Sequence, residues 1–78
     1  MDNNITNSED SITFSDEIED GRLVTVLQRY NPITDKTSPV AELTIFHQDY
    51  FTSSEISVFI SRKEARLLRK KLKQFIKG

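Results

Sequence analysis

The side chains most able to do chemistry in this chain are cations near its C-terminus. Residues 62–78 carry eight Lys or Arg side chains and a single acidic one, Glu64. At about 100° per residue, seven of these cations fall on one flank of a helix. This basic flank consists of Arg62, Lys63, Arg66, Arg69, Lys70, Lys73 and Lys77. Such a row of cations can contact the phosphates of a nucleic acid or the carboxylates of an acidic protein.

The same pattern also fits an ordinary solvated helix surface, so the basic flank alone does not decide between these uses. Leu67 is predicted to project to the polar side of this helix, among Lys63, Lys70 and Lys71. Isolated exposed leucines are common. A leucine ringed by cations is nevertheless a suitable contact for an acidic partner protein or a second subunit.

Residues for catalysis or metal binding are scarce. His47 is the one histidine and there is no cysteine, so a metal site lacks converging donors. The acidic stretch 15–21 fails as a calcium loop, because Ile18 and Leu27 stand where oxygen ligands are needed. The two glycines cannot form a phosphate-binding loop. We therefore expect no enzymatic activity, no cofactor and no metal.

Charge is unevenly distributed along the chain. The net charge is −1, yet residues 1–20 hold seven acidic side chains and no basic one. Such asymmetry points to a charged partner or to an internal charge match. Aromatic side chains for stacking on unpaired bases are available at Phe46, Tyr50, Phe51 and Phe59. The pI of about 5.7 weakens a nucleic-acid function, since dedicated binders tend to be basic.

The chain is long enough for one small domain. Residues 1–10 are polar and lack a hydrophobic period, which predicts a disordered acidic and polar tail before a single domain over 11–78. Asp20-Gly21 predicts a type I′ turn that joins strands over roughly 11–19 and 22–30. That turn places Ile18 opposite Leu23 and Phe14 opposite Leu27.

Two more strands are predicted by alternating apolar residues over 40–46 and 55–60. An antiparallel pairing sets Ile45 opposite Ile56, Leu43 opposite Val58 and Ala41 opposite Ile60. One face of this second hairpin is then wholly apolar. We expect this face to receive the C-terminal helix.

The helix is predicted to begin after Ser61, because Ser61 and Glu64 match a capping box. Its apolar stripe consists of Ala65, Leu68, Leu72, Phe75 and Ile76. The predicted fold is α+β: a four-stranded antiparallel sheet of two hairpins, followed by one amphipathic helix on one face (β-β-β-β-α). The stripe should dock on the face that carries Leu43, Ile45, Ile56 and Val58.

One helix cannot cover both faces of a sheet, and an uncovered apolar face usually marks an interaction site. The opposite face is expected to carry the candidates for a dimer or ligand surface. These are Val24, Val26, Tyr30, Phe46 and Phe59. A homodimer is therefore expected.

The layout of strands followed by a capped helix is similar to that of single-stranded-DNA-binding transcriptional coactivators and of many small proteins from phages and mobile elements. The likeness rests on the hydrophobic pattern of the second half of the chain. It implies a fold, whereas function must come from a site.

The sequence thus favours a small non-enzymatic regulatory protein that binds an acidic partner protein as a homodimer, from a phage or mobile element. The alternative is a module that binds single-stranded DNA or RNA through the basic flank and the aromatics. The chain shows neither a signal peptide nor a membrane span, which favours the cytoplasm. The partner-binding candidates are Arg62, Arg66, Leu67, Arg69, Lys70, Lys73 and Lys77.

Overall fold

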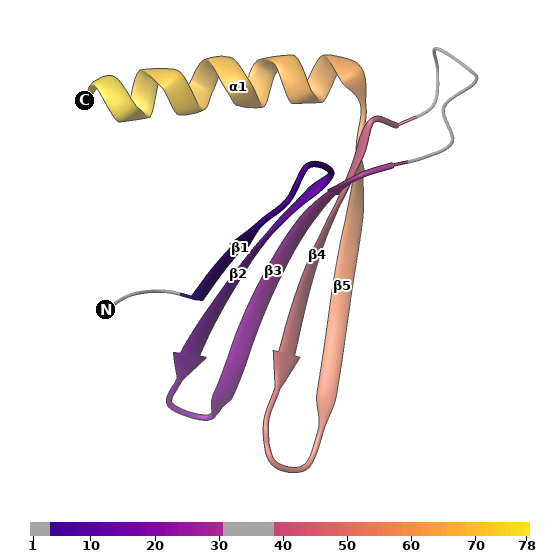
Figure 1. Cartoon of the computed structure of the whole chain (residues 1–78), viewed down its shortest axis with the longest axis vertical. Coiled ribbons are helices and arrows are strands. Elements are labelled where there is room, and N and C mark those ends of the chain that lie inside the picture. Colours follow the sequence, from indigo (N-terminus) through magenta and orange to yellow (C-terminus); the bar gives the residue numbers. More distant parts are fainter. Residues whose placement is uncertain (1–3, 31–38) are drawn as a thin grey trace.

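The computed structural model describes residues 4–30 and 39–78, which form an antiparallel sheet followed by a C-terminal helix (Figure 1). The elements are β1 (Asn4–Asn7), β2 (Ser11–Ile18), β3 (Gly21–Arg29), β4 (Ala41–Gln48), β5 (Ser53–Ile60) and α1 (Arg62–Lys77). Each strand pairs with the next along the chain, in the order β1-β2-β3-β4-β5. The α+β class is confirmed, but the predicted number of four strands is wrong because the sheet has five.

The additional strand, β1, lies in the segment that we expected to be a tail. Ile5 pairs with Phe14 and Asn7 pairs with Ile12. Ser8 makes the turn between the two strands, and its N–H donates to the carbonyl of Ser11 at 2.8 Å. With one apolar residue in four, the strand gives no periodic signal. Its backbone hydrogen bonds with β2 hold it in the sheet.

The register of the first hairpin differs from the prediction by two residues. Ile18 pairs with Gly21 and Phe14 with Thr25, so the turn centre is Glu19-Asp20. A type I′ turn at Asp20-Gly21 would need a positive φ at Asp20. Among the described residues only glycines have one, and Gly21 has φ 146°. A shift of two residues preserves which side chains share a face.

The second hairpin has the predicted register. Ala41 pairs with Ile60, Leu43 with Val58 and Ile45 with Ile56. Alternation of apolar and polar residues excludes the odd shifts, which would turn the apolar set to the opposite face. The turn in which the Asp49 N–H donates to the Thr52 carbonyl is consistent with the observed register among the even shifts.

The two faces of the sheet differ strongly in polarity. One face, which we call the apolar face, carries hydrophobic side chains from all five strands. They are Ile5, Ile12, Phe14, Ile18, Leu23, Leu27, Ala41, Leu43, Ile45, Ile56, Val58 and Ile60. The other face, which we call the mixed face, combines Val24, Val26, Phe46 and Phe59 with many Ser, Thr, Gln and Glu side chains. Antiparallel sheets commonly pack one face and solvate the other, so the apolar face is the one that requires a cover.

The helix α1 does not supply this cover, and the predicted docking onto Leu43, Ile45, Ile56 and Val58 is wrong. It runs across the end of the sheet instead of lying on the sheet face (Figure 1). No residue of α1 is buried, and Leu72 and Ile76 of its stripe are 56% and 84% exposed. The physical reason lies in the connection. β5 ends at Ile60 and Ser61 is already the N-cap, so no residues are left for a turn back onto the sheet.

The chain consequently buries little apolar surface. Ile60 is the only buried hydrophobic residue among those described. The accessible surface is 6751 Å², whereas a compact monomer of 9.0 kDa exposes about 4,900 Å². The radius of gyration is 14.6 Å, against about 11–12 Å for a compact chain of this length.

Candidate functional site

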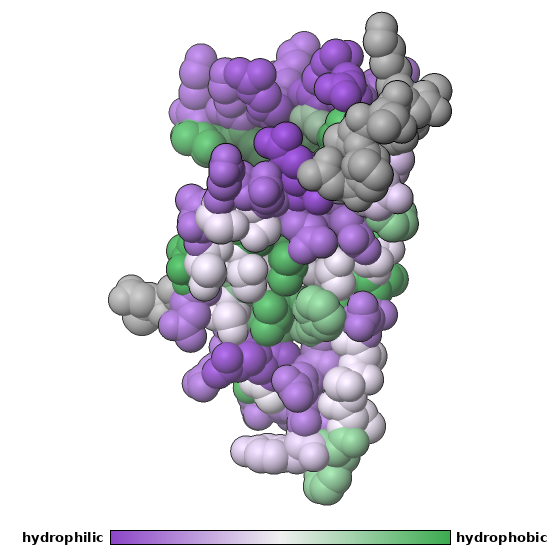
Figure 2. All heavy atoms as spheres, turned by 45° about the vertical axis from the view of Figure 1, so that its right-hand side comes forward, coloured by the Kyte–Doolittle hydropathy of each residue, from purple (hydrophilic) through white to green (hydrophobic). Residues whose placement is uncertain are grey.

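A hydrophobic groove lies where α1 leaves the sheet. It encloses about 500 Å³ between the apolar face and the first turns of the helix. Its lining comprises Leu43, Val58, Phe59, Ile60, Glu64, Leu67, Leu68 and Lys71. Figure 2 shows hydrophobic side chains beneath the polar outer side of the helix, toward the sheet. The groove and the apolar face form a continuous surface, because Leu43, Val58 and Ile60 belong to both.

The orientation of α1 above this groove is set by local hydrogen bonds. Ser61 has extended backbone angles (φ −76°, ψ 166°) and caps the helix. Its Oγ accepts from the Glu64 N–H at 3.1 Å, and its own N–H donates to Glu64 Oε1 at 2.8 Å. Just before it, the carbonyl of Ile60 accepts from the Val40 N–H at 2.9 Å. The strand therefore stays paired up to the residue that precedes the cap. The predicted capping box is confirmed.

Leu67 lies on the groove side of α1. We expected it among cations on the polar side, but it lines the groove together with Leu68 and Lys71. On an ideal helix the groove side and the basic flank are roughly 160° apart. Leu67, which is 58% exposed, thus lies at the border between the groove and the basic flank, since Lys63 and Lys70 are its neighbours one turn away on the helix. A helical wheel could not show this, because it does not tell which side of a helix faces its sheet.

The basic flank is a coherent surface in the structure. Arg66, Arg69, Lys70 and Lys73 line a shallow depression of about 260 Å³ on the exposed side of the helix. All four residues are exposed. The ion pairs among the described residues, Arg22–Glu17 at 3.7 Å and Arg29–Asp10 at 3.2 Å, both lie within the sheet. Within the part of the chain that the structure describes, neither pair uses one of these helix cations.

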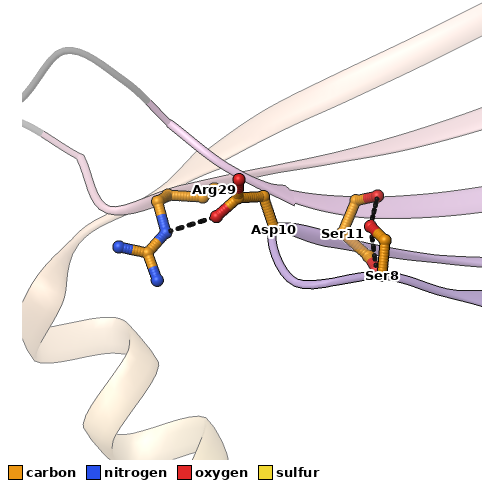
Figure 3. A network of polar contacts seen from close by, with 4 residues as sticks. All are labelled: Ser8, Asp10, Ser11 and Arg29. Atoms are coloured by element: carbon orange, nitrogen blue, oxygen red, sulfur yellow. Dashed lines mark hydrogen bonds and ion pairs between the residues drawn. The ribbon is translucent and has the colours of Figure 1, made fainter.

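The Arg29–Asp10 pair anchors the turn between β1 and β2 at the end of β3 (Figure 3). The Arg29 N–H also donates to the Asp10 carbonyl at 2.7 Å. In the same turn the Ser8 Oγ lies 3.2 Å from the carbonyl of Ser11. One of the acidic side chains of the N-terminal segment, Asp10, is thus engaged in an ion pair within the same chain. Asp10 is thus directed to a strand cation and not to the basic flank.

The aromatic side chains proposed for base stacking lie at three separate places. Tyr50 and Phe51 occupy the β4–β5 turn and are 92% and 93% exposed. Phe46 lies on the mixed face, and Phe59 stacks edge-on against Tyr30 with ring centroids 5.3 Å apart. Figure 1 shows the β4–β5 turn at the end of the sheet opposite to α1. A single chain therefore does not bring the basic flank and the exposed aromatics of this turn together.

The mixed face contains the residues expected to form a dimer or ligand surface. Val24, Val26 and Tyr30 are half-buried. A depression of about 460 Å³ is lined by Val24 and Phe46 with Gln48, Ser53, Ser54 and Glu55, and by His47. Its polar lining resembles a solvated sheet face more than a core. The structure places these candidates on one face, and leaves the apolar face uncovered as well.

The β4–β5 turn is ordered by Asp49. Its Oδ1 accepts from the N–H groups of Thr52 at 2.6 Å and Phe51 at 2.8 Å. These bonds, with that of Thr52 the larger effect, hold the pKa of the Asp49 carboxyl below its usual range. His47 lies two residues before, on the apolar face opposite Leu23. Within residues 4–30 and 39–78, no cluster of three or more His, Cys, Asp or Glu side chains is arranged for a metal ion.

Comparison with protein-family models, curated proteins and solved structures gives no match. In the part of the chain that the structure describes, no helix has the length and apolar character needed to cross a bilayer. The function must therefore be argued from the surfaces themselves.

Proposed function

We propose that this chain is a small non-enzymatic regulatory protein of the cytoplasm, which works as a homodimer and binds an acidic segment of a partner protein. The basic flank of α1 is the surface that contacts the partner. The apolar face and the groove serve self-association. This division assigns one task to each side of the helix.

The observation that carries this proposal is the separation of the two sides of α1. The cluster formed by Arg66, Arg69, Lys70 and Lys73 lies on the side away from the groove. A subunit or helix that filled the groove would leave these cations in solvent. Long cationic side chains on an exposed helix steer an anionic partner and contribute to the specificity of its binding.

Binding of single-stranded nucleic acid is the second candidate. Tyr50 and Phe51 are almost fully exposed, and exposed aromatic side chains are stacking platforms for unpaired bases. Within one chain this turn and the basic flank lie at opposite ends of the sheet (Figure 1), so a strand bound by a single chain would not contact both. Two acidic side chains, Glu17 and Asp49, line the surface beside Tyr50 together with one cation, Arg22, which pairs with Glu17 at 3.7 Å. This turn therefore lacks the excess of cations that a phosphate backbone requires.

The test is fluorescence anisotropy with two labelled probes, a poly-glutamate peptide and an oligothymidylate, each at about 50 and 150 mM salt. We expect the peptide to bind at both salt concentrations and the oligonucleotide to fail at the higher one. Lys73→Glu should weaken peptide binding. Lys71→Glu, which reverses a charge on the groove side of the same helix, is the matched control and should change it far less.

Tight binding of the oligonucleotide at the higher salt would overturn the proposal in favour of the second candidate. Equal losses for Lys73→Glu and Lys71→Glu would show that net charge, and not the basic flank, attracts the peptide. Failure of the peptide to bind at either salt concentration would contradict an acidic partner.

A further inference from the structure

We infer that the partner which covers the apolar face is a second copy of this chain, with α1 of each subunit lying across the apolar face of the other subunit's sheet. This inference specifies the homodimer of the proposed function and rests on it. It identifies the self-association surface as the apolar face and the helix stripe, and not the mixed face.

The connection between β5 and α1 holds each helix away from its own sheet. Ile60 is buried and its carbonyl is bonded to Val40, and Ser61 follows as the cap. Folding α1 back onto its own sheet would require breaking the capping box or unpairing the end of β5. A helix whose apolar stripe does not lie on its own sheet can still lie on an identical sheet in another molecule, as in domain-swapped dimers.

The dimensions of the two surfaces match. The 16 residues of α1 span about 24 Å at 1.5 Å per residue. Five strands at a spacing of about 4.8 Å place β1 and β5 roughly 19 Å apart. The helix is therefore long enough to cross the whole sheet. Its stripe from Ala65 to Ile76 spans about 16 Å, so it would lie over most of a sheet face that carries apolar side chains from Ile5 on β1 to Val58 on β5.

The exposed area has the size that an obligate dimer requires. The chain exposes 6751 Å², which is about 1,900 Å² more than a compact monomer of its mass. If each subunit buried only half of this excess, the interface would total about 1,900 Å². That reaches the size of stable protein interfaces, and burial of the full excess would reach the range of obligate homodimers.

The charges also suit this arrangement. On an ideal helix the centre of the apolar stripe and the centre of the basic flank are roughly 130° apart. A helix that laid its stripe on the partner's sheet would keep Arg66 and Lys73 at the surface of the dimer. Burial of unpaired cations, which would oppose association, is thereby avoided.

The experiment uses the absence of native cysteine in the full chain. Ile76→Cys in one tagged chain is mixed and refolded with Ile45→Cys in another, and a short bismaleimide is added. Phe14→Cys replaces Ile45→Cys in a second mixture. We expect a mixed covalent dimer of twice 9.0 kDa in at least one of the two mixtures. Thr44→Cys, next to Ile45 but on the mixed face, is the control and should give far less product.

Several results would overturn the inference. If Ile76→Cys chains were cross-linked efficiently only to one another, the dimer would be formed by paired helices. If Ile45→Cys chains were cross-linked only to one another, the dimer would be formed by stacked sheets. A larger yield with Thr44→Cys would move the interface to the mixed face. A monomer in sedimentation at tens of micromolar, without intermolecular product, would exclude a dimer. None of these readouts depends on the poly-glutamate peptide. A dimer that forms but does not bind the peptide would therefore contradict the acidic partner alone and leave the dimer inference intact.

Discussion

Ser61 and Glu64 bind each other reciprocally at the start of α1. The Glu64 N–H donates to Ser61 Oγ at 3.1 Å, and the Ser61 N–H donates to Glu64 Oε1 at 2.8 Å. Because Ser61 is also the only residue between β5 and α1, this pair sets both where the helix begins and in which direction it leaves the sheet.

Ser61→Ala should lower the free energy of unfolding by about 1 kcal/mol, since a helix N–H loses its acceptor. Thermal denaturation followed by circular dichroism measures the change. Ser57→Ala, at an exposed position of β5, is the control and should shift stability by less than about 0.5 kcal/mol. Equal effects of the two substitutions would argue against a role for the capping box.

Acid should destabilise the fold below about pH 4. Hydrogen bonds from Thr52 and Phe51 lower the pKa of Asp49, and those from Ser61 lower the pKa of Glu64. A carboxyl whose pKa is lower in the folded state adds stability above its unfolded pKa, which is about 4. That contribution is lost as the pH falls through the folded pKa. The measurement is the melting temperature between about pH 2 and 7. As the pH is lowered, it should fall less steeply in the double variant Asp49→Asn, Glu64→Gln than in the parent.

Gly21→Ala should destabilise the sheet by at least about 1 kcal/mol. Gly21 has φ 146°, and a Cβ there would overlap the carbonyl oxygen of Gln48 on β4. Gly78→Ala is a matched control, because Gly78 also has a positive φ but faces open space at the chain end. Denaturant unfolding of both variants checks the prediction. A neutral Gly21→Ala would mean that β3 and β4 can separate at this point without cost.

Leu72→Ala should weaken the dimer, although Leu72 is 56% exposed in the single chain. If the partner's sheet buries this side chain, truncation costs about 2–5 kcal/mol, or at least roughly thirtyfold in dissociation constant. Sedimentation over a range of concentrations measures the shift. Arg69→Ala on the basic flank should leave the dimer unchanged. An unaltered dimer in Leu72→Ala would place the interface elsewhere.

Replacing Tyr50 and Phe51 by Ser should leave stability within about 0.5 kcal/mol of the parent, because both side chains are over 90% exposed. The β4–β5 turn keeps its Asp49 hydrogen bonds, which use backbone N–H groups and Thr52. Under the proposed function, the poly-glutamate peptide should bind this variant as it binds the parent. A marked loss of binding would transfer the partner site to the turn.

Local sequence patterns predicted those features of the fold that depend on residues close together in the sequence. The alternation over residues 40–46 and 55–60 predicted the register of β4 with β5, and the Ser61–Glu64 spacing predicted the capping box. Parity also assigned Phe14 and Leu27 to one face correctly, although their predicted pairing was wrong. Period and cap chemistry depend on a few adjacent residues, so they are readable from a single chain.

Other features depended on contacts that no local pattern encodes. β1 has one apolar side chain and is held by backbone pairing with β2, and the turn at Glu19-Asp20 was selected by backbone angles and not by the Asp-Gly pair. The residues of the basic flank follow from the helical period alone. That Leu67 lines the groove could be seen only from the position of the helix relative to the sheet.

The sequence by itself determined which residues are apolar on each strand and along the helix, and where the helix begins. Only the tertiary structure decided that these two apolar surfaces meet within one chain at the groove alone, beside the start of the helix. The physical reason is the direct connection through Ser61: a capped helix that follows a fully paired strand without a loop cannot turn back over the same sheet. The apolar surface that remains exposed is the one that the proposed dimer would bury through the hydrophobic effect.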